Sequence, residues 1–282
     1  MRIGVIILPD RPWAEAAPLW RRVEELGYSR AWTYDHLVWE GLPDHEWHST
    51  VTTLTAAALS TTTLRLGTWV SSPNFRHPAT FARDLTSLSD LSGGRITCAV
   101  GAGGNRDSQI LGDDLTRGQR TRRLREFVDV LDRCLTGDHI DHDGDFYHTR
   151  DFRNLSDVAP VPLLVAANGP KGIALAAERG QGWVTTGIGN PDLEAWWRSV
   201  AELTDRHREE CRRRDVEQTR HLSIDAAPRY AFDSIEFFRE QYGRAAELGF
   251  DEIAIHHPRA EGAYAGDPEI LDAIAEEFGP DL

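Results

Sequence analysis

The sequence has few cysteines and no long apolar run, and each shortage excludes a class of protein. Of its 282 residues only Cys98, Cys134 and Cys211 are cysteines, and they form no CxxC pair, so neither a disulfide framework nor a thiolate metal site is expected. No apolar stretch approaches the roughly 18 residues of a membrane-spanning helix. The strand-like residues 1–8 carry no signal-peptide pattern. We therefore expect reduced thiols, no membrane partner and a cytoplasmic location.

Positive charge is also scarce. The formal net charge is −14, which argues against a nucleic-acid partner, because such proteins neutralise many phosphates with basic side chains. The same charge disfavours an anionic membrane surface. Arginines do cluster in residues 117–125 and 206–214, but both segments have helical periodicity, and we interpret them as solvated helix faces. A small-molecule substrate is the expected partner.

Lysine is nearly absent. All but one of the 31 basic residues are arginine, and the single lysine, Lys171, lies in an Ala-Asn-Gly-Pro-Lys-Gly segment. Proline is favoured in the first turn of a helix, and the N–H groups of that turn are free to bind an anion. A cation beside them suits a phosphate. Chance placement of the lysine remains the alternative.

Motifs for metal binding and for the commonest enzyme classes are missing. Histidines with neighbouring acids occur only in loops, at His45 and His48 and at His139, Asp141, His142, Asp143 and His148. None has the fixed spacing of a helical HExxH motif or a zinc finger. The sequence also lacks a GxSxG elbow, a GxxxxGK[ST] loop and a strand-linked GxGxxG. We predict no catalytic metal and no common hydrolase, NTPase or Rossmann chemistry.

Apolar runs alternate with amphipathic segments along the whole chain. The predicted strands are Ile3–Leu8, Arg30–Tyr34, Arg65–Val70, Ile96–Val100, Leu163–Ala166, Trp183–Thr185, Ser223–Ala227 and Glu252–His256. The predicted helices are Ala14–Leu26, Val51–Ser60, Pro78–Leu91, Arg120–Leu135, Lys171–Arg179, Asp192–Arg213, Ser234–Leu248 and Pro268–Phe278. Strict alternation predicts an α/β fold, a single (β/α)8 TIM barrel over residues 1–282. An extended insertion between the fourth helix and the fifth strand, Thr136–Pro162, is expected to hold a hairpin or lid.

The active site of such a barrel lies at the carboxyl ends of its strands. Asp35 and His36 follow the second predicted strand, and an acid beside an imidazole can position a proton donor. The alternative is that Asp35 satisfies loop N–H groups while His36 only packs. Two hydroxyl side chains, Ser71 and Ser72, follow the third strand. We expect them to hydrogen-bond a ligand, and a turn formed by these residues is the alternative. His256 ends the eighth strand. It either faces the substrate or packs against neighbouring side chains.

Glycine-rich turns follow three further strands. Gly101, Gly103 and Gly104 end the fourth strand, and glycine lets the backbone approach a flat ring or an anion closely. The turn 168–172 follows the fifth strand and is suited to bind an anion. The turn 185–189 adds a second flexible segment nearby. A tight turn without any ligand remains the alternative for the first of these segments.

Taken together, four motifs resemble the bacterial luciferase-like family of flavin-dependent oxidoreductases, which includes enzymes that use the deazaflavin coenzyme F420. The resemblance is carried by Glu24–Tyr28 with Trp32–His36, by Leu66–Thr68 through Arg76–Pro78, by Leu91–Arg95 with Val100–Gly103, and by Pro162–Trp183. It implies an F420-dependent reductase or dehydrogenase that moves hydride to or from a small organic substrate. An FMN-dependent monooxygenase is the alternative, and a non-catalytic flavin-binding protein is the third. The match in residues 67–78 favours the deazaflavin.

The resemblance also implies roles for individual residues and a homodimer. His36 aligns with the active-site histidine of the family, and His36 and Asp107 are the expected catalytic residues. From their own positions, in a loop and at a strand end, Trp39 and His256 are expected to face the substrate, with packing as the alternative for both. A non-prolyl cis peptide is expected at Trp69–Val70. The expected cofactor-binding residues are Asp35, Trp69, Val70, Ser71, Ser72, Gly101, Ala102, Gly103, Asn168, Gly169, Pro170, Lys171, Gly172, Thr186 and Gly187.

One position departs from the family pattern. Deazaflavin-dependent sugar-phosphate dehydrogenases that resemble this chain place a glutamate just after the Gly-x-Gly, whereas this sequence has Gly104 there and Asp107 three residues later. That particular dehydrogenase activity is therefore not expected.

Overall fold

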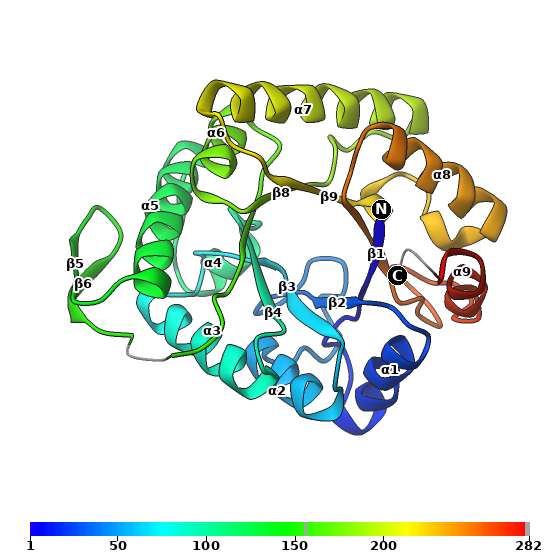
Figure 1. The fold of residues 1–282 in the computed structure, drawn as a ribbon, viewed down its shortest axis with the longest axis horizontal. Coiled ribbons are helices and arrows are strands. Elements are labelled where there is room, and N and C mark those ends of the chain that lie inside the picture. Colours follow the sequence, from blue (N-terminus) through cyan, green and yellow to red (C-terminus); the bar gives the residue numbers. More distant parts are fainter. Residues whose placement is uncertain (155–156, 280–282) are drawn as a thin grey trace.

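Eight parallel strands close into a barrel in this computed structural model, which describes residues 1–154 and 157–279 (Figure 1). Around the barrel the order is β1-β10-β9-β8-β7-β4-β3-β2. The strands are β1 Arg2–Ile6, β2 Arg30–Thr33, β3 Arg65–Ser71, β4 Ile96–Gly101, β7 Leu163–Ala166, β8 Gly182–Thr185, β9 Thr219–Ser223 and β10 Glu252–His256. The predicted (β/α)8 architecture is confirmed.

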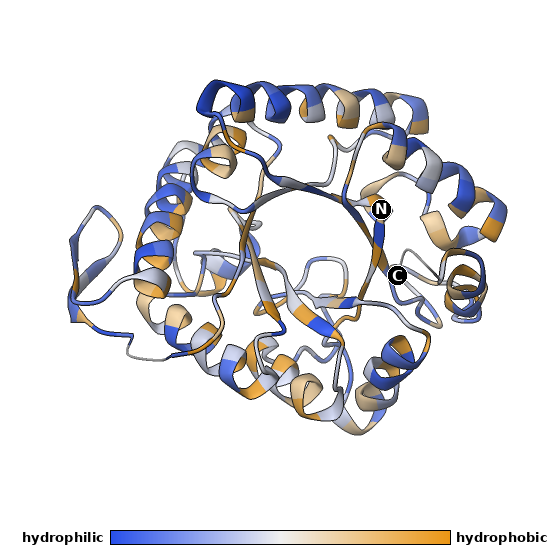
Figure 2. Cartoon of the chain, viewed as in Figure 1, coloured by the Kyte–Doolittle hydropathy of each residue, from blue (hydrophilic) through white to orange (hydrophobic). Residues whose placement is uncertain are grey.

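Helices surround the barrel and turn their apolar stripes toward the strands, so that their outer faces are mostly hydrophilic (Figure 2). They are α1 Trp13–Glu25, α2 Thr50–Ser60, α3 Pro78–Ser92, α4 Arg106–Ile110, α5 Arg117–Thr136, α6 Pro170–Arg179, α7 Leu193–Arg214, α8 Ile235–Glu247 and α9 Ile270–Phe278. The short α4 was not predicted. No helix among the residues described is both long and apolar enough to cross a membrane.

Local sequence signals account for the end of α3 before strand β4 and for the start of α5 after it. Thr116 and Gln119 form a capping box that starts α5, in which each side chain satisfies a backbone N–H that the helix leaves free. Helix α3 ends at Gly93, which adopts a left-handed conformation with φ of 65°, where a side chain would be disfavoured. Strand β4, its glycine turn and the short α4 thus lie between two helices with defined ends.

The insertion after α5 forms the expected hairpin, β5 Ile140–Asp143 paired with β6 His148–Phe152; residues 155–156 of the insertion lie outside the described residues. Glu126 of α5 accepts hydrogen bonds from the backbone N–H groups of Phe146 and Tyr147. These bonds hold the hairpin on the outside of the helical ring (Figure 1). It does not cover the barrel mouth, so the alternative expectation of a lid was wrong.

Strand β9 lies four residues earlier than predicted. The sequence pattern indicated Ser223–Ala227, but the strand is Thr219–Ser223, and Ile224–Ala226 form a short 3-10 turn. The apolar residues Ile224, Ala226 and Ala227 misled the prediction because they lie directly after the end of the strand. Polar residues of β9, among them Thr219 and His221, face a cavity at the opposite end of the barrel.

Candidate functional site

A cavity of about 610 Å³ lies at the carboxyl ends of β3, β4, β7 and β8. It collects most of the glycine-rich segments that the sequence analysis singled out. Val70, Ala166, Val184 and Leu124 supply its apolar wall. The residues expected to bind a cofactor that line it are Val70, Gly101, Ala102, Gly103, Asn168, Gly169, Pro170, Lys171, Gly172 and Thr186.

The charge of this cavity is opposite to that of the protein. Lys171, Arg117 and Arg120 line it, and no aspartate or glutamate of the described ranges 1–154 and 157–279 does, although the whole chain has a net charge of −14. The Nε atom of Arg120 is buried and has no hydrogen-bond partner among the residues described. A buried donor without a partner is costly. The cavity is therefore suited to a ligand with anionic groups.

Two helices present these cations. Residues Arg117, Arg120, Thr121 and Leu124 of α5 all line the cavity, and their i, i+3, i+4, i+7 spacing places them on one helix face. Helix α6 points its first turn at the same space, with Gly169 as N-cap and Pro170 in the first turn. Its leading N–H groups have no intrahelical acceptor and add to the positive potential.

A buried polar network holds the glycine turn after β4. Gly103 has a φ of 65°, and a Cβ added there would lie 2.4 Å from Asn74 Nδ2. The Asn74 amide donates to the Gly104 carbonyl over 2.7 Å and accepts from Arg123 over 2.5 Å. The close approach of Asn74 therefore requires glycine at position 103.

The turns after β7 and β8 are joined through Asn168. Its side-chain nitrogen donates to Thr186 Oγ1 and to the Gly187 carbonyl, and its oxygen accepts from Thr185. The Asn168 amide thus ties the two turns together and has little capacity left for a ligand. Gly187 packs against Trp196 and does not line the cavity.

The residues at the end of β3 divide between the cavity and the barrel interior. The Trp69–Val70 peptide is cis, as the resemblance implied. Val70 lines the cavity, whereas the Trp69 ring lies inside the barrel and donates to Ser223 over 3.2 Å. Ser71 and Ser72 are buried beside the cavity without lining it, and Ser71 Oγ has no partner among the described residues.

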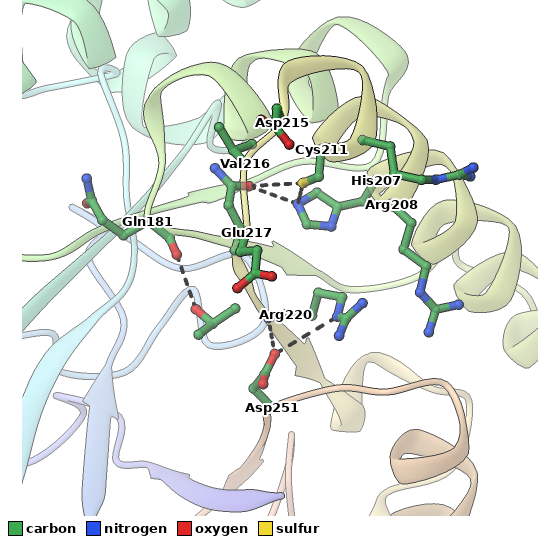
Figure 3. Close-up of a pocket in the computed structure, with 12 residues that line it drawn as sticks. Gln181, His207, Arg208, Cys211, Asp215, Val216, Glu217, Arg220 and Asp251 are labelled. Atoms are coloured by element: carbon green, nitrogen blue, oxygen red, sulfur yellow. Dashed lines mark hydrogen bonds and ion pairs between the residues drawn. The ribbon is translucent and has the colours of Figure 1, made fainter.

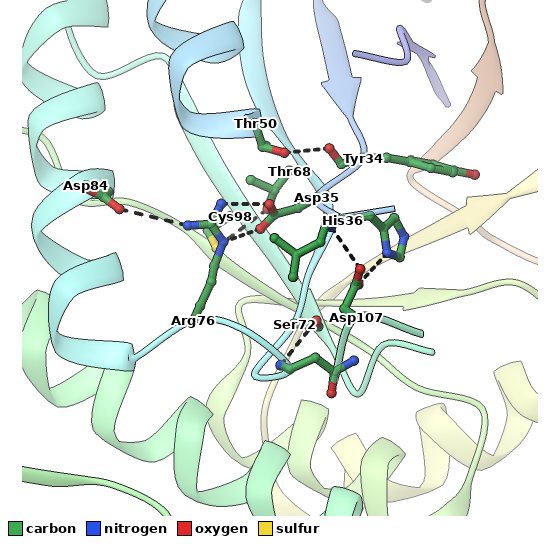
Figure 4. Close-up of polar contacts among 12 residues, drawn as sticks. Tyr34, Asp35, His36, Thr50, Thr68, Ser72, Arg76, Asp84, Cys98 and Asp107 are labelled. Atoms are coloured by element: carbon green, nitrogen blue, oxygen red, sulfur yellow. Dashed lines mark hydrogen bonds and ion pairs between the residues drawn. The ribbon is translucent and has the colours of Figure 1, made fainter. Parts of the chain in front are cut away.

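His36 and Asp107 meet across the barrel mouth. His36 Nδ1 lies 2.8 Å from Asp107 Oδ2, and the N–H of Leu37 donates to Asp107 Oδ1 over 2.8 Å (Figure 4). Burial by itself raises the pKa of Asp107, but the hydrogen bonds from His36 and from the Leu37 and Val38 backbone outweigh it, and the pKa is lowered. Asp107 is therefore ionised, so the proton of this bond lies on His36 Nδ1.

Asp35 points away from His36 and forms a buried ion pair. Its carboxylate is 1% exposed and accepts two hydrogen bonds from Arg76, at 2.5 and 2.7 Å (Figure 4). Arg76 also lies 4.0 Å from Asp84. Asp35 is not among the residues that line the cavity, and both of its oxygens are engaged by Arg76. It joins the turn after β2 to the turn after β3.

Aromatic side chains form the neighbouring wall of the mouth. Trp39 stacks on Tyr264 with ring centroids 5.6 Å apart, and Tyr264 in turn stacks on His256. Trp47 lies 6.2 Å from the His36 ring. Trp39 is partly exposed, whereas His256 is 1% exposed beneath Tyr264. In this arrangement the Tyr264 ring covers His256.

His256 instead belongs to a hydrogen-bonded chain. Its Nδ1 lies 3.2 Å from Asp225, and its Nε2 lies 2.9 Å from the Tyr34 hydroxyl. Burial lowers the pKa of His256 even though Asp225 opposes the shift, so the ring is neutral near pH 7. The Tyr34 hydroxyl also contacts that of Tyr264 over 3.1 Å. This series of hydrogen bonds connects the end of β2, the end of β10 and the segment after β9.

Sequence reasoning missed three contributors to this region. Arg117 and Arg120 were assigned to a solvated helix face. The signal that separates them from their neighbours is that they lie seven and four residues before the apolar Leu124, on the same helix face. Asp225 was placed within a strand. Its role depends on the shifted end of β9, which no local pattern indicated.

Comparison with known proteins gives a consistent result. The family model described as luciferase-like monooxygenase matches residues 1–277. The 5,10-methylenetetrahydromethanopterin reductase of Archaeoglobus fulgidus is 27% identical over 69% of this chain and 55% of its own length. The F420-dependent hydroxymycolic acid dehydrogenase of Mycobacterium tuberculosis is 34% identical over 57% of this chain and 46% of its own.

The solved structures agree on the fold. An F420-dependent secondary alcohol dehydrogenase in complex with an F420–acetone adduct superposes with a TM-score of 0.80 at 17% identity, covering 100% of this chain and 99% of that one. The chain spans about half the length of the curated relatives that it matches by sequence.

Proposed function

Because the chain belongs to the luciferase-like monooxygenase family, we propose that it is an oxidoreductase that uses coenzyme F420 to reduce or oxidise a small organic substrate. The observation that carries this proposal is the cavity at the carboxyl ends of the strands, which has three cations and no acid. The two sequence relatives named above support the choice of reaction class.

The cavity residues fit the anionic part of such a coenzyme. Lys171 and Arg120 would hold a phosphate at the start of α6, where the free N–H groups of the first helical turn add further donors. The unpartnered Arg120 Nε supports this assignment. An added Cβ on Gly169 would meet no atom within 4 Å, so the backbone of this turn is open to a ligand.

The planar part of the coenzyme fits the other wall. Val70, Gly101 and Ala102 line the cavity with little side-chain bulk, which leaves room for a flat ring against the backbone. The bound coenzyme supplies hydride transfer. The protein then has to orient the substrate, exclude water and exchange one proton.

We assign the proton exchange to His36. Asp107 holds the proton on Nδ1, and Nε2 is the ring nitrogen left for a substrate atom. The ionised Asp107 also fixes the tautomer and the orientation of the ring, so that Nε2 is held toward the site where a proton is exchanged. Trp39, partly exposed and stacked on Tyr264, offers an apolar face to the substrate. His256 contributes indirectly, through its bond to Tyr34.

Three expectations complete the proposal: a single domain over residues 1–282, a homodimer and a cytoplasmic location. The dimer is supported by the family resemblance alone. The reducing environment of the cytoplasm is supported by the three cysteines, which are all free and buried. Light scattering after gel filtration tests the dimer.

The proposed function is tested by titrating the purified protein with F420 and with FMN while following the fluorescence of each coenzyme. We expect F420 to bind, and the reduced coenzyme to be oxidised anaerobically by members of a panel of imines, activated alkenes and ketones. Lys171→Gln should weaken F420 binding. Arg122→Gln, which removes a cation of α5 that does not line this cavity, should not. Binding of FMN with consumption of oxygen would instead identify a monooxygenase, and binding of neither coenzyme would overturn the proposal.

A further inference from the structure

A second cavity, of about 420 Å³, lies at the opposite end of the barrel. It is lined by residues at the starts of the strands: Arg2 of β1, Arg30 of β2, Thr219 and His221 of β9, and Glu252 of β10. In a TIM barrel this end is remote from the active site. The coenzyme proposal makes no use of it.

Three buried side chains in this cavity each have one polar atom without a hydrogen-bond partner among the residues described. They are Arg30 Nε, His221 Nδ1 and Glu252 Oε2. The side chains are 6%, 4% and 2% exposed respectively. Buried polar atoms are nearly always satisfied by protein, water or ligand. Three unsatisfied atoms that line one cavity therefore indicate something that binds between them.

The strand register brings these atoms together. Glu252 pairs directly with His221 between β10 and β9, and the distance from Glu252 Oε2 to His221 Nδ1 is 3.8 Å. Arg30 Nη1 lies 3.4 Å from the same oxygen without the alignment of a hydrogen bond. The other oxygen, Oε1, accepts from Trp32 Nε1 over 2.8 Å, which fixes the direction of the carboxylate.

The hydrogen bonds of His221 show what the missing partner must offer. Thr219 Oγ1 donates to the Gln181 carbonyl, so it accepts from His221 Nε2, which lies 2.9 Å away. The Nδ1 atom of the neutral ring therefore presents a lone pair. Burial, together with the nearby Arg30, lowers the pKa of His221 to about 3, which agrees with a neutral ring.

A ligand here must donate to two acceptors, His221 Nδ1 and Glu252 Oε2, and accept from one donor, Arg30 Nε. The lining side chains include two arginines, Arg2 and Arg30, and two carboxyl groups, Asp251 and Glu252. Burial raises the pKa of the Glu252 carboxyl, which disfavours a strongly anionic lining, and neither sign of charge dominates, so the cavity favours a ligand without net charge. One water molecule can make these bonds. However, the cavity is about an order of magnitude larger than the roughly 30 Å³ that a water occupies.

We propose that this cavity is a second ligand site, which binds a small molecule of no net charge that carries an NH2 or NH3+ group beside an acceptor oxygen. Primary amides and α-amino acids both have this chemistry. The nitrogen would donate to Glu252 and His221, and the oxygen would accept from Arg30.

A path from the surface reaches this site. A larger cavity of about 780 Å³ adjoins it, since Gln181, Thr219 and Asp251 line both. Figure 3 shows its wall, where His207 and Cys211 of α7 face the segment that leads into β9 and Arg220 faces Asp251. Asp215 and Glu217 at its edge are exposed, so a solute can enter from this side.

The test measures the thermal unfolding midpoint of the full chain, without coenzyme, against acetamide and glycine up to tens of millimolar. Acetate and methylammonium serve as charged analogues. We expect a saturable rise with acetamide or with glycine, and none with the analogues, because a ligand that binds only the folded state stabilises it. A response to acetamide would identify a primary amide as the ligand class, and a response to glycine would identify an α-amino acid. Calorimetric titration then measures its affinity.

The variant Glu252→Gln keeps the side-chain volume and the acceptor for Trp32 but replaces the carboxylate at Oε2. We expect at least tenfold weaker binding of the responding probe. Asp215→Asn, at the exposed edge of the outer cavity, should bind it as the original chain does. If Glu252→Gln does not fold, His221→Gln takes its place. No stabilisation by either probe, or a crystal soaked with them that shows water alone on the three atoms, would overturn the proposal.

Discussion

Asp107 accepts a hydrogen bond from His36 Nδ1 over 2.8 Å and thereby leaves Nε2 as the only ring nitrogen of His36 that can exchange a proton with a substrate. The two residues are 71 positions apart in the sequence. They meet because the turn after β2 and the short α4 after β4 both lie at the mouth of the barrel.

Asp107→Asn should lower kcat by about 100-fold, within the range that general acid–base catalysis contributes, while F420 affinity stays unchanged. The amide of Asn can either accept from Nδ1 or turn its NH2 group toward it, so the tautomer and the orientation of the His36 ring are no longer fixed. Steady-state kinetics and a coenzyme titration measure the two effects separately. Ser108→Ala, at the next position of α4, is the control and should retain kcat. Equal losses of kcat and coenzyme affinity in Asp107→Asn would contradict this role.

Lys171→Gln and Arg120→Gln should each weaken F420 binding by about tenfold, which corresponds to about 1.4 kcal/mol. Each variant removes one cation from the cavity. The salt dependence of binding should also become shallower, because fewer charges attract the ligand. Fluorescence titrations at several salt concentrations provide the measurement. Arg122→Gln removes the same charge from α5 without touching this cavity, so a similar loss in that variant would mean that only net charge matters.

Gly103→Ala and Gly104→Ala should differ sharply although they are adjacent. A Cβ at position 103 would lie 2.4 Å from Asn74 Nδ2, in a backbone conformation with φ of 65°, whereas one at position 104 meets only Glu40, at 3.9 Å. Gly103→Ala should lose about 1–3 kcal/mol of stability and much of its F420 affinity. Urea unfolding and coenzyme titration check both. Equal behaviour of the two variants would show that the turn adapts freely.

Asp35→Asn should destabilise the fold by about 3–5 kcal/mol, since it leaves Arg76 buried without its carboxylate partner. Urea unfolding gives the free energy change. Glu277→Gln breaks a pair with Arg239 at the surface and should leave stability almost unchanged. The double variant Asp35→Asn with Arg76→Met should recover part of the loss. A mild effect of Asp35→Asn alone would instead indicate that water reaches the pair.

Stability should decline as the pH falls below about 6.5, the ordinary pKa of histidine. Burial lowers the pKa of His221 to about 3 and also lowers that of His256. Between the lowered pKa of the folded chain and pH 6.5, the unfolded chain binds protons on these histidines that the folded chain does not. Acid therefore favours unfolding, and the full stability is present above pH 6.5. Urea midpoints measured from pH 7 to pH 4 test this expectation. His221→Gln should reduce the slope by about one proton, and an unchanged slope would contradict the assignment.

The barrel was predictable from sequence because its strands are nearly all apolar and its helices are amphipathic, and both patterns are local. The exception is β9, whose early residues Thr219 and His221 face a polar cavity and therefore lack an apolar signal. The insertion hairpin was also predictable, but its position was not. That position depends on Glu126 of α5, which accepts bonds from the distant residues Phe146 and Tyr147.

The sequence by itself determined the architecture, the order of the glycine turns and the presence of a lone lysine at the start of α6, because each of these depends on residues that are neighbours in the chain. Only the tertiary structure decided which side chains meet. It paired Asp35 with Arg76 instead of a ligand, joined His36 to Asp107, and brought Arg117 and Arg120 beside Lys171. These contacts depend on how the closed barrel places the ends of distant strands around one axis, and local patterns carry no record of that geometry.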